Sequence, residues 1–169
     1  LIPPEHGRRV AAAAGGRSEF VLLRGAGHPA LADDPAGRGM DAVERFLAAT
    51  GLPKGHPWCA AFVRYCFDQI NVKTTITAWS PTSTPRHRMI WHKGKVLRKA
   101  PEPGDVFSIY YANLRRIGHT GFVDGWPEGS PYAATVEGNT NAQNSREGNG
   151  CYRRIRLKRN LHAVADWLD

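Results

Sequence analysis

The fold is decided by Pro57-Trp58-Cys59-Ala60-Ala61-Phe62-Val63-Arg64-Tyr65-Cys66-Phe67, a stretch that reads as an amphipathic helix with a cysteine near its start. Pro57 suits the first helical position, because the N–H group that proline lacks would be unpaired there in any residue. Apolar residues recur with the spacing of one helical face; they are Cys59, Phe62, Val63, Cys66, Phe67 and Ile70. We therefore expect this face to pack inward and the helix to end near Asn71.

Cys59 falls in the first turn of this helix, where free backbone N–H groups and the positive end of the helix dipole favour a thiolate. The thiolate is the reactive form of cysteine, so Cys59 is a candidate nucleophile. The same position also suits a small buried hydrophobic residue, which is how cysteine behaves in many cores. The stretch alone supports both interpretations.

Helical patterns precede this stretch. We expect Met40–Thr50 to form a helix that Gly51 ends, and a fainter helical pattern covers residues 17–24. The residues that follow the Cys59 helix, 74–99, have an ambiguous pattern. Ser80–Pro85 breaks regular structure there, and we expect a short helix after it.

Strand patterns begin after a turn at Pro101–Asp105. The expected strands cover residues 106–111, 118–123, 132–137 and 151–157. A polar loop is expected from Gly138 to Gly150, and a helix or strand at the end, over Leu161–Leu168. Helices followed by antiparallel strands make an α+β fold. A chain of 169 residues suits one domain, which we assign to residues 36–169, with residues 1–35 as an N-terminal extension without assigned structure.

The chain is strongly basic, with a net charge of +8 and a pI of about 9.8. This charge favours an anionic partner, such as nucleic acid or an anionic bacterial envelope. Of the two most basic segments, 86–99 and 153–159, we expect the second to be a strand with a solvated face. No apolar run approaches the roughly 20 residues that span a bilayer, and residues 1–20 lack the apolar core of a signal peptide. Because the chain begins with Leu1, we expect a fragment or a processed form.

The three cysteines, Cys59, Cys66 and Cys151, cannot form a complete disulfide framework because their number is odd. There is no Cys-x-x-Cys pair, which argues against a structural zinc site. We predict no metal and no cofactor. A bridge between Cys66 and Cys151 stays open, and the default role of Cys66 is to fill the core.

A cysteine nucleophile needs a base. Seven histidines are present, and His119 stands out because it opens a β-rich run between Gly118 and Gly121. Glycines at such positions allow another segment or a substrate to come close. We expect His56 in a surface turn or at the edge of a cleft, whereas His87 and His92 read as surface residues.

The base also needs a partner that orients it, and Glu137-Gly138-Asn139 is a candidate segment. Glu137 ends a predicted strand, and site residues collect at strand ends and in the loops that follow them. An acid there can hold the imidazole tautomer, and an amide can donate to an oxyanion. From the composition alone, an ordinary strand end is the favoured interpretation.

Four segments in order carry a resemblance to a known family. They are 56–63 (HPWCAAFV), 103–107 (PGDVF), 118–123 (GHTGFV) and 136–141 (VEGNTN). Together they resemble the CHAP family of cysteine, histidine-dependent amidohydrolases and peptidases, which cut bacterial peptidoglycan. The resemblance covers residues 40–157.

This resemblance implies a papain-like α+β fold, with N-terminal helices packed on an antiparallel β-sheet that carries the histidine. It assigns the nucleophile to Cys59, the base to His119 and the third catalytic member to Glu137, with Asn139 as the next polar group of the motif. Papain-like enzymes often place a glutamine before the cysteine, and none precedes Cys59 closely. We therefore expect the backbone N–H of Cys59 and the Asn139 side chain to hold the oxyanion.

The implied activity is hydrolysis of an amide bond in peptidoglycan through a thioester, by an N-acetylmuramoyl-L-alanine amidase or an endopeptidase. Two alternatives are a non-catalytic module that binds cell wall or nucleic acid, and a papain-like thiol protease that acts on proteins. The expected partner is peptidoglycan, with nucleic acid less favoured, and an immunity or inhibitor protein if the domain is a delivered toxin. We expect a secreted protein, or one delivered to the periplasm or cell wall.

Overall fold

The computed structural model describes residues 38–141, 148 and 150–168. The helix expected over 17–24 and the N-terminal extension at 1–35 lie outside the described residues. None of the described helices is long and apolar enough to cross a membrane.

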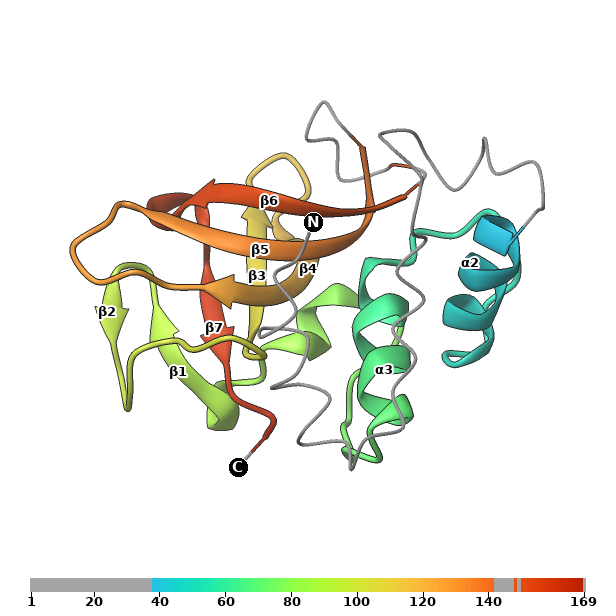
Figure 1. The fold of residues 1–169 in the computed structure, drawn as a ribbon, viewed down its shortest axis with the longest axis horizontal. Coiled ribbons are helices and arrows are strands. Elements are labelled where there is room, and N and C mark those ends of the chain that lie inside the picture. Colours follow the sequence, from blue (N-terminus) through green and yellow to red (C-terminus); the bar gives the residue numbers. More distant parts are fainter. Residues whose placement is uncertain (1–37, 142–147, 149, 169) are drawn as a thin grey trace.

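Within the described residues, two α-helices precede the sheet, α2 (Arg38–Ala48) and α3 (Cys59–Gln69). In Figure 1, α3 lies between α2 and the sheet. The Phe46 ring of α2 joins the two helices, since its centroid lies 5.5 Å from that of Trp58 and 5.4 Å from that of Phe62. The chain leaves α2 through Gly51, whose φ of 71° is a conformation that glycine adopts without strain. The helix predicted over Met40–Thr50 is therefore confirmed, with both ends shifted by two residues.

Cys59 lies in the first turn of α3, as the sequence predicts, but the helix begins at Cys59 and not at Pro57. Trp58 is the N-cap residue, with φ −122° and ψ 15°, so Pro57 precedes the helix and that prediction is wrong. The physical reason is the burial of Trp58, which is 5% exposed and packs on Phe46. The helix ends at Gln69, and Asn71, with φ 58°, turns the chain away.

The sheet has seven strands in the order β2-β1-β7-β3-β4-β5-β6, and each neighbouring pair is antiparallel. The strands are β1 (Met89–His92), β2 (Lys95–Val96), β3 (Val106–Tyr111), β4 (Arg116–Gly125), β5 (Tyr132–Thr140), β6 (Gly150–Leu157) and β7 (Ala163–Ala165). Three short 3₁₀ turns are η1 (Ser80–Ser83), η2 (Arg86–Arg88) and η3 (Lys158–Asn160). Together the helices and this sheet make the predicted α+β class.

Several strands differ from their predicted limits. The ambiguous segment 74–99 holds η1, η2, β1 and β2, and the open choice over Leu161–Leu168 is resolved as strand β7. β5 continues to Thr140, so the polar loop does not begin at Gly138. The reason is a register shift after Glu137, which lets Thr140 pair with Gly150.

Successive residues of β3 enter two different cores, because side chains alternate across a sheet. Val106 belongs to the cluster under α3, whereas Phe107 belongs to the cluster on the other face. In the first cluster the Phe122 ring of β4 lies 6.0 Å from that of Phe62 and 5.3 Å from that of Phe67. These contacts fix α3 on β4 and hold the start of the helix against the sheet.

Candidate active site

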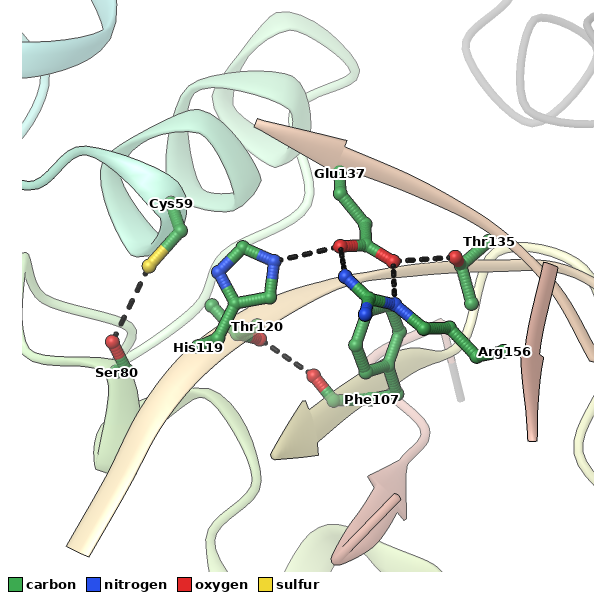
Figure 2. Close-up of polar contacts among 8 residues, drawn as sticks. All are labelled: Cys59, Ser80, Phe107, His119, Thr120, Thr135, Glu137 and Arg156. Carbon is green, nitrogen blue, oxygen red and sulfur yellow. Dashed lines mark hydrogen bonds and ion pairs between the residues drawn. The ribbon is translucent and has the colours of Figure 1, made fainter. Parts of the chain in front are cut away.

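Cys59 is the first residue of α3, and its side chain is only 2% exposed. Its Sγ atom lies 3.4 Å from the Oγ of Ser80, the first residue of η1 (Figure 2). Cys59 therefore combines the two interpretations that the sequence supports. It is a buried residue, and it stands at the N-terminus of a helix beside a polar group.

His119 lies on β4 opposite Ile109 of β3, and it is fully buried. Its Nε2 atom is 2.8 Å from Oε2 of Glu137, and its Nδ1 faces the sulfur of Cys59 (Figure 2). The next residue, Thr120, donates its hydroxyl to the Phe107 carbonyl at 2.7 Å, which ties this part of β4 to β3. The structure thus brings Cys59, His119 and Glu137 together in one row.

Gly121 and Gly138 allow this close approach of strands and helix. A Cβ atom on Gly121 would lie 2.6 Å from the Val136 carbonyl oxygen of β5. A Cβ atom on Gly138 would lie 2.7 Å from Cγ of Phe62 in α3. The expectation that a glycine beside His119 lets another segment come close is confirmed at Gly121.

Glu137 lies on β5 with no exposed surface, and it accepts hydrogen bonds on both carboxylate oxygens (Figure 2). The hydroxyl of Thr135 donates to Oε1 at 2.6 Å. The guanidinium of Arg156, on β6, donates from Nε to Oε1 at 2.8 Å and from the second nitrogen to Oε2 at 2.6 Å. With His119 on Oε2, the carboxylate is surrounded by donors.

Neighbouring charges decide the protonation states of these buried groups. Burial opposes ionisation of Cys59, but hydrogen bonds and charge from His119, with donors at Ser80 and the Thr120 backbone, lower the pKa of its thiol. Burial would lower the pKa of His119, but Cys59 and Glu137 raise it to about 9. Burial would raise the pKa of Glu137, but Arg156 and His119 lower it to about 2. These directions all favour a thiolate, an imidazolium and a carboxylate.

Asn139 is buried near the end of β5, in the left-handed region with φ 58°. It follows Glu137 by two residues at the register shift between β5 and β6. This conformation is more accessible to asparagine than to most residues. Its expected contact with an oxyanion stays a prediction.

The other histidines of the described residues lie away from this row. His56 is exposed in the turn before α3, which fits the surface position expected for it. His87 is exposed on η2, whereas His92 is half-buried, with its ring 4.9 Å from that of His162. Within residues 38–141, 148 and 150–168, no group of three His, Cys, Asp or Glu side chains is arranged to hold a metal ion.

Three residues of this site were not identified from the sequence: Ser80, Thr135 and Arg156. Ser80 reads only as part of a segment that breaks regular structure. Arg156 belongs to a basic segment that we expected to be a solvated strand face, and for this residue the expectation is wrong because its side chain is 14% exposed and bound to Glu137. Side chains along β6 alternate between the two faces of the sheet, and this alternation is the one signal in the sequence that distinguishes Arg156 from Arg153. Arg153 pairs with Asp124.

Cys66 and Cys151 take no part in this row, and both are free thiols. Cys66 packs against the core under α3, as expected, and burial raises the pKa of its thiol. Cys151 is exposed on β6.

Comparison with known proteins adds one match. The profile of the CHAP domain family matches residues 51–139, which is more than half of the chain and includes Cys59, His119 and Glu137. No curated protein and no solved structure matches the chain. The family match, which covers the segments that carry the site, shows that the chain belongs to the CHAP domain family.

Proposed function

We propose that this CHAP domain is a peptidoglycan hydrolase that cleaves an amide bond with Cys59 as its nucleophile. CHAP domains are generally hydrolases, and membership of the family suggests peptidoglycan as the substrate. The observation that carries the proposal is the buried row in which His119 contacts Glu137 through Nε2 and faces the Cys59 sulfur through Nδ1. Such a row of nucleophile, base and orienting acid is the arrangement that covalent amide hydrolysis requires.

In the proposed reaction, the Cys59 thiolate attacks the carbonyl carbon of the amide, and the carbonyl oxygen becomes an oxyanion. The imidazolium of His119 gives its proton to the nitrogen as the C–N bond breaks, which releases the amine and leaves a thioester on Cys59. Water then attacks the thioester while His119 takes its proton, and the acid product leaves as the thiolate returns. Acid–base help of this kind typically contributes ~100- to 10,000-fold in rate.

Four further groups have proposed roles in this reaction. Glu137 holds the His119 ring and stabilises its charged form, as its hydrogen bond of 2.8 Å suggests. The Ser80 hydroxyl donates to the thiolate from 3.4 Å. The backbone N–H of Cys59 and the side chain of Asn139 are our proposed donors to the oxyanion.

The proposal extends to the fold family and to the cellular location of the protein. We propose that the architecture is papain-like, because the nucleophile begins a helix that packs on the antiparallel sheet carrying the histidine. A substrate in the cell wall implies a protein that is secreted or delivered to the periplasm or wall. The net charge of +8 supports this setting, because the envelope is anionic.

The test is digestion of purified peptidoglycan followed by mass spectrometry of the soluble fragments. An amidase would release stem peptides with a free L-alanine amine, whereas an endopeptidase would release sugar-linked peptides cut within the stem or cross-bridge. A His119→Ala variant is the control for contaminating hydrolases. Casein digested in parallel separates the alternative, because cleavage of casein without release from peptidoglycan would contradict the proposal and favour a protein-directed thiol protease.

A further inference from the structure

Arg156 makes a two-pronged contact with Glu137 that crosses from β6 to β5 (Figure 2). Its Nε donates to one carboxylate oxygen at 2.8 Å and its terminal nitrogen to the other at 2.6 Å. A guanidinium fork matches a carboxylate in this geometry, so it fixes the plane of the acid as well as its position. The contact is nearly closed to solvent, since the side chain of Glu137 is 0% exposed and that of Arg156 is 14% exposed.

The contact completes a row of alternating charge. When the site is active, the row reads thiolate, imidazolium, carboxylate and guanidinium, from Cys59 through His119 and Glu137 to Arg156. Its net charge is zero with Arg156 and negative without it. Burying an uncompensated charge is costly, so a row that lacked the guanidinium would resist the ionisation of Cys59.

We infer that Arg156 is a positioning residue of the active site, which keeps Glu137 ionised, aims it at His119 and balances the charge of the Cys59–His119 pair. This inference rests on the proposed function, because it assigns Arg156 a part in the same reaction. It adds a fourth member to the row, one that acts through Glu137.

Other titratable groups also face this contact. His119 faces Glu137 from β4, and Tyr152 lies opposite it on β6. The charge of Arg154, also on β6, acts on Glu137, and Tyr111 of β3 acts on Arg156. Arg156 binds the carboxylate through two hydrogen bonds, of 2.8 and 2.6 Å, and His119 binds it through one, of 2.8 Å. We therefore expect Arg156 to dominate among the cations of β6.

The test measures how fast iodoacetamide alkylates Cys59 as the pH is varied, with the Cys59 peptide quantified by mass spectrometry. The midpoint of the profile reports thiolate formation, and this readout needs no substrate. Arg156→Met removes the charge and the fork, whereas Arg156→Lys keeps the charge and removes the fork. Arg153→Met is the matched control. It also removes one positive charge from β6, but Arg153 pairs with Asp124 and not with Glu137.

We expect Arg156→Met to move the midpoint upward by about 0.5 to 1 pH unit, because loss of a nearby cation disfavours the thiolate. Arg156→Lys should keep the midpoint of the parent protein but lower the plateau rate, by about tenfold. Arg153→Met should leave both unchanged. If Arg156→Met fails to fold, the Glu137→Gln/Arg156→Met double variant removes both charges and should return the midpoint to that of the parent at a low plateau.

The outcomes separate the two claims. Suppose that the parent midpoint lies below that of an ordinary thiol and that Arg156→Met lowers the rate without moving this midpoint. That result would overturn the role of Arg156 and leave the proposed function standing. An Arg156→Lys variant that matches the parent in rate would overturn the role of the fork. A parent Cys59 that titrates as an ordinary thiol would overturn the Cys59–His119 pair and the inference together.

Discussion

At the scale of single residues, the lowered pKa of the Cys59 thiol depends on donors from two separate segments. His119 comes from β4, Ser80 from η1 and the Thr120 N–H from β4 as well, while the thiol itself begins α3. Burial alone would keep the proton on the sulfur, and these donors reverse that preference. The thiolate is therefore a property of the assembled site and not of the helix start alone.

The Ser80 hydroxyl supports a first prediction. A hydrogen bond to a charged group typically contributes about 1.5 to 3 kcal/mol, so we expect Ser80→Ala to lower kcat/KM by about 10- to 100-fold. The acid limb of the pH profile should also move to higher pH, since the thiolate loses a donor. Steady-state kinetics with peptidoglycan fragments measure both quantities. Ser130→Ala, in a turn far along the chain, is the control, and equal kinetics for the two variants would refute a role for Ser80.

The pKa of His119 supports a second prediction. Because this pKa is raised to about 9, the imidazolium that protonates the leaving amine is present below that pH and lost above it. We expect kcat/KM to fall as the pH rises through about 9. Glu137→Gln removes an anion that stabilises the imidazolium, so its alkaline limb should lie at lower pH. A Glu137→Gln profile that ends at the same pH as that of the parent would contradict the contact.

At the scale of elements, the turn before β3 explains a motif whose role is not chemical. Asp105 accepts the Glu102 N–H at 2.7 Å on Oδ2, and its carbonyl accepts the Val123 N–H at 2.7 Å. Gly104, with φ 100°, makes the turn possible. The Pro103-Gly104-Asp105 segment therefore starts β3 in register with β4, which carries His119.

Asp105 supports a third prediction, on stability. Burial, with the charge of Asp166 nearby, raises the pKa of Asp105 to about 7, from 3.8. Between these values the folded protein holds a proton that the unfolded chain has lost, so this group makes the free energy of unfolding fall as the pH rises from about 4 to 7. The Asp105→Asn side chain can still accept the Glu102 N–H. We expect the free energy of unfolding of this variant to fall over this window by at least about 1 kcal/mol less than that of the parent. Urea unfolding at pH 5 and pH 8 measures it, with Asp68→Asn on α3 as the control, and parallel curves for parent and Asp105→Asn would contradict the argument.

The elements that could be predicted are those whose signal is local. The helix at Cys59 and the strands of Phe107 and His119 follow from the spacing of their own apolar residues. β1, β2 and β7 are too short for such a signal, since β7 has three residues. β1 and β7 become strands by pairing with each other from distant parts of the chain, and β2 forms a hairpin with β1. The extension of β5 to Thr140 likewise depends on its pairing with Gly150.

At the scale of the whole molecule, the same difference between local patterns and long-range contacts explains which residues of the site could be predicted. The order of the family motifs identifies Cys59, His119 and Glu137, because each lies in a short stretch with its own pattern. Ser80 and Arg156 join them only through the fold, which brings η1 to the start of α3 and β6 to the end of β5. A charge count along the sequence cannot separate Arg156 from the other basic residues of its strand.

The proposed function depends on the Cys59 thiolate as the group that carries out the hydrolysis. The most direct test compares the parent with Cys59→Ala in the release of soluble fragments from purified peptidoglycan, with circular dichroism to confirm that both are folded. We expect a folded variant whose rate is lower by about 1,000-fold or more, since removal of a nucleophile abolishes the covalent route. A folded Cys59→Ala protein that degrades peptidoglycan at the parent rate would contradict the account.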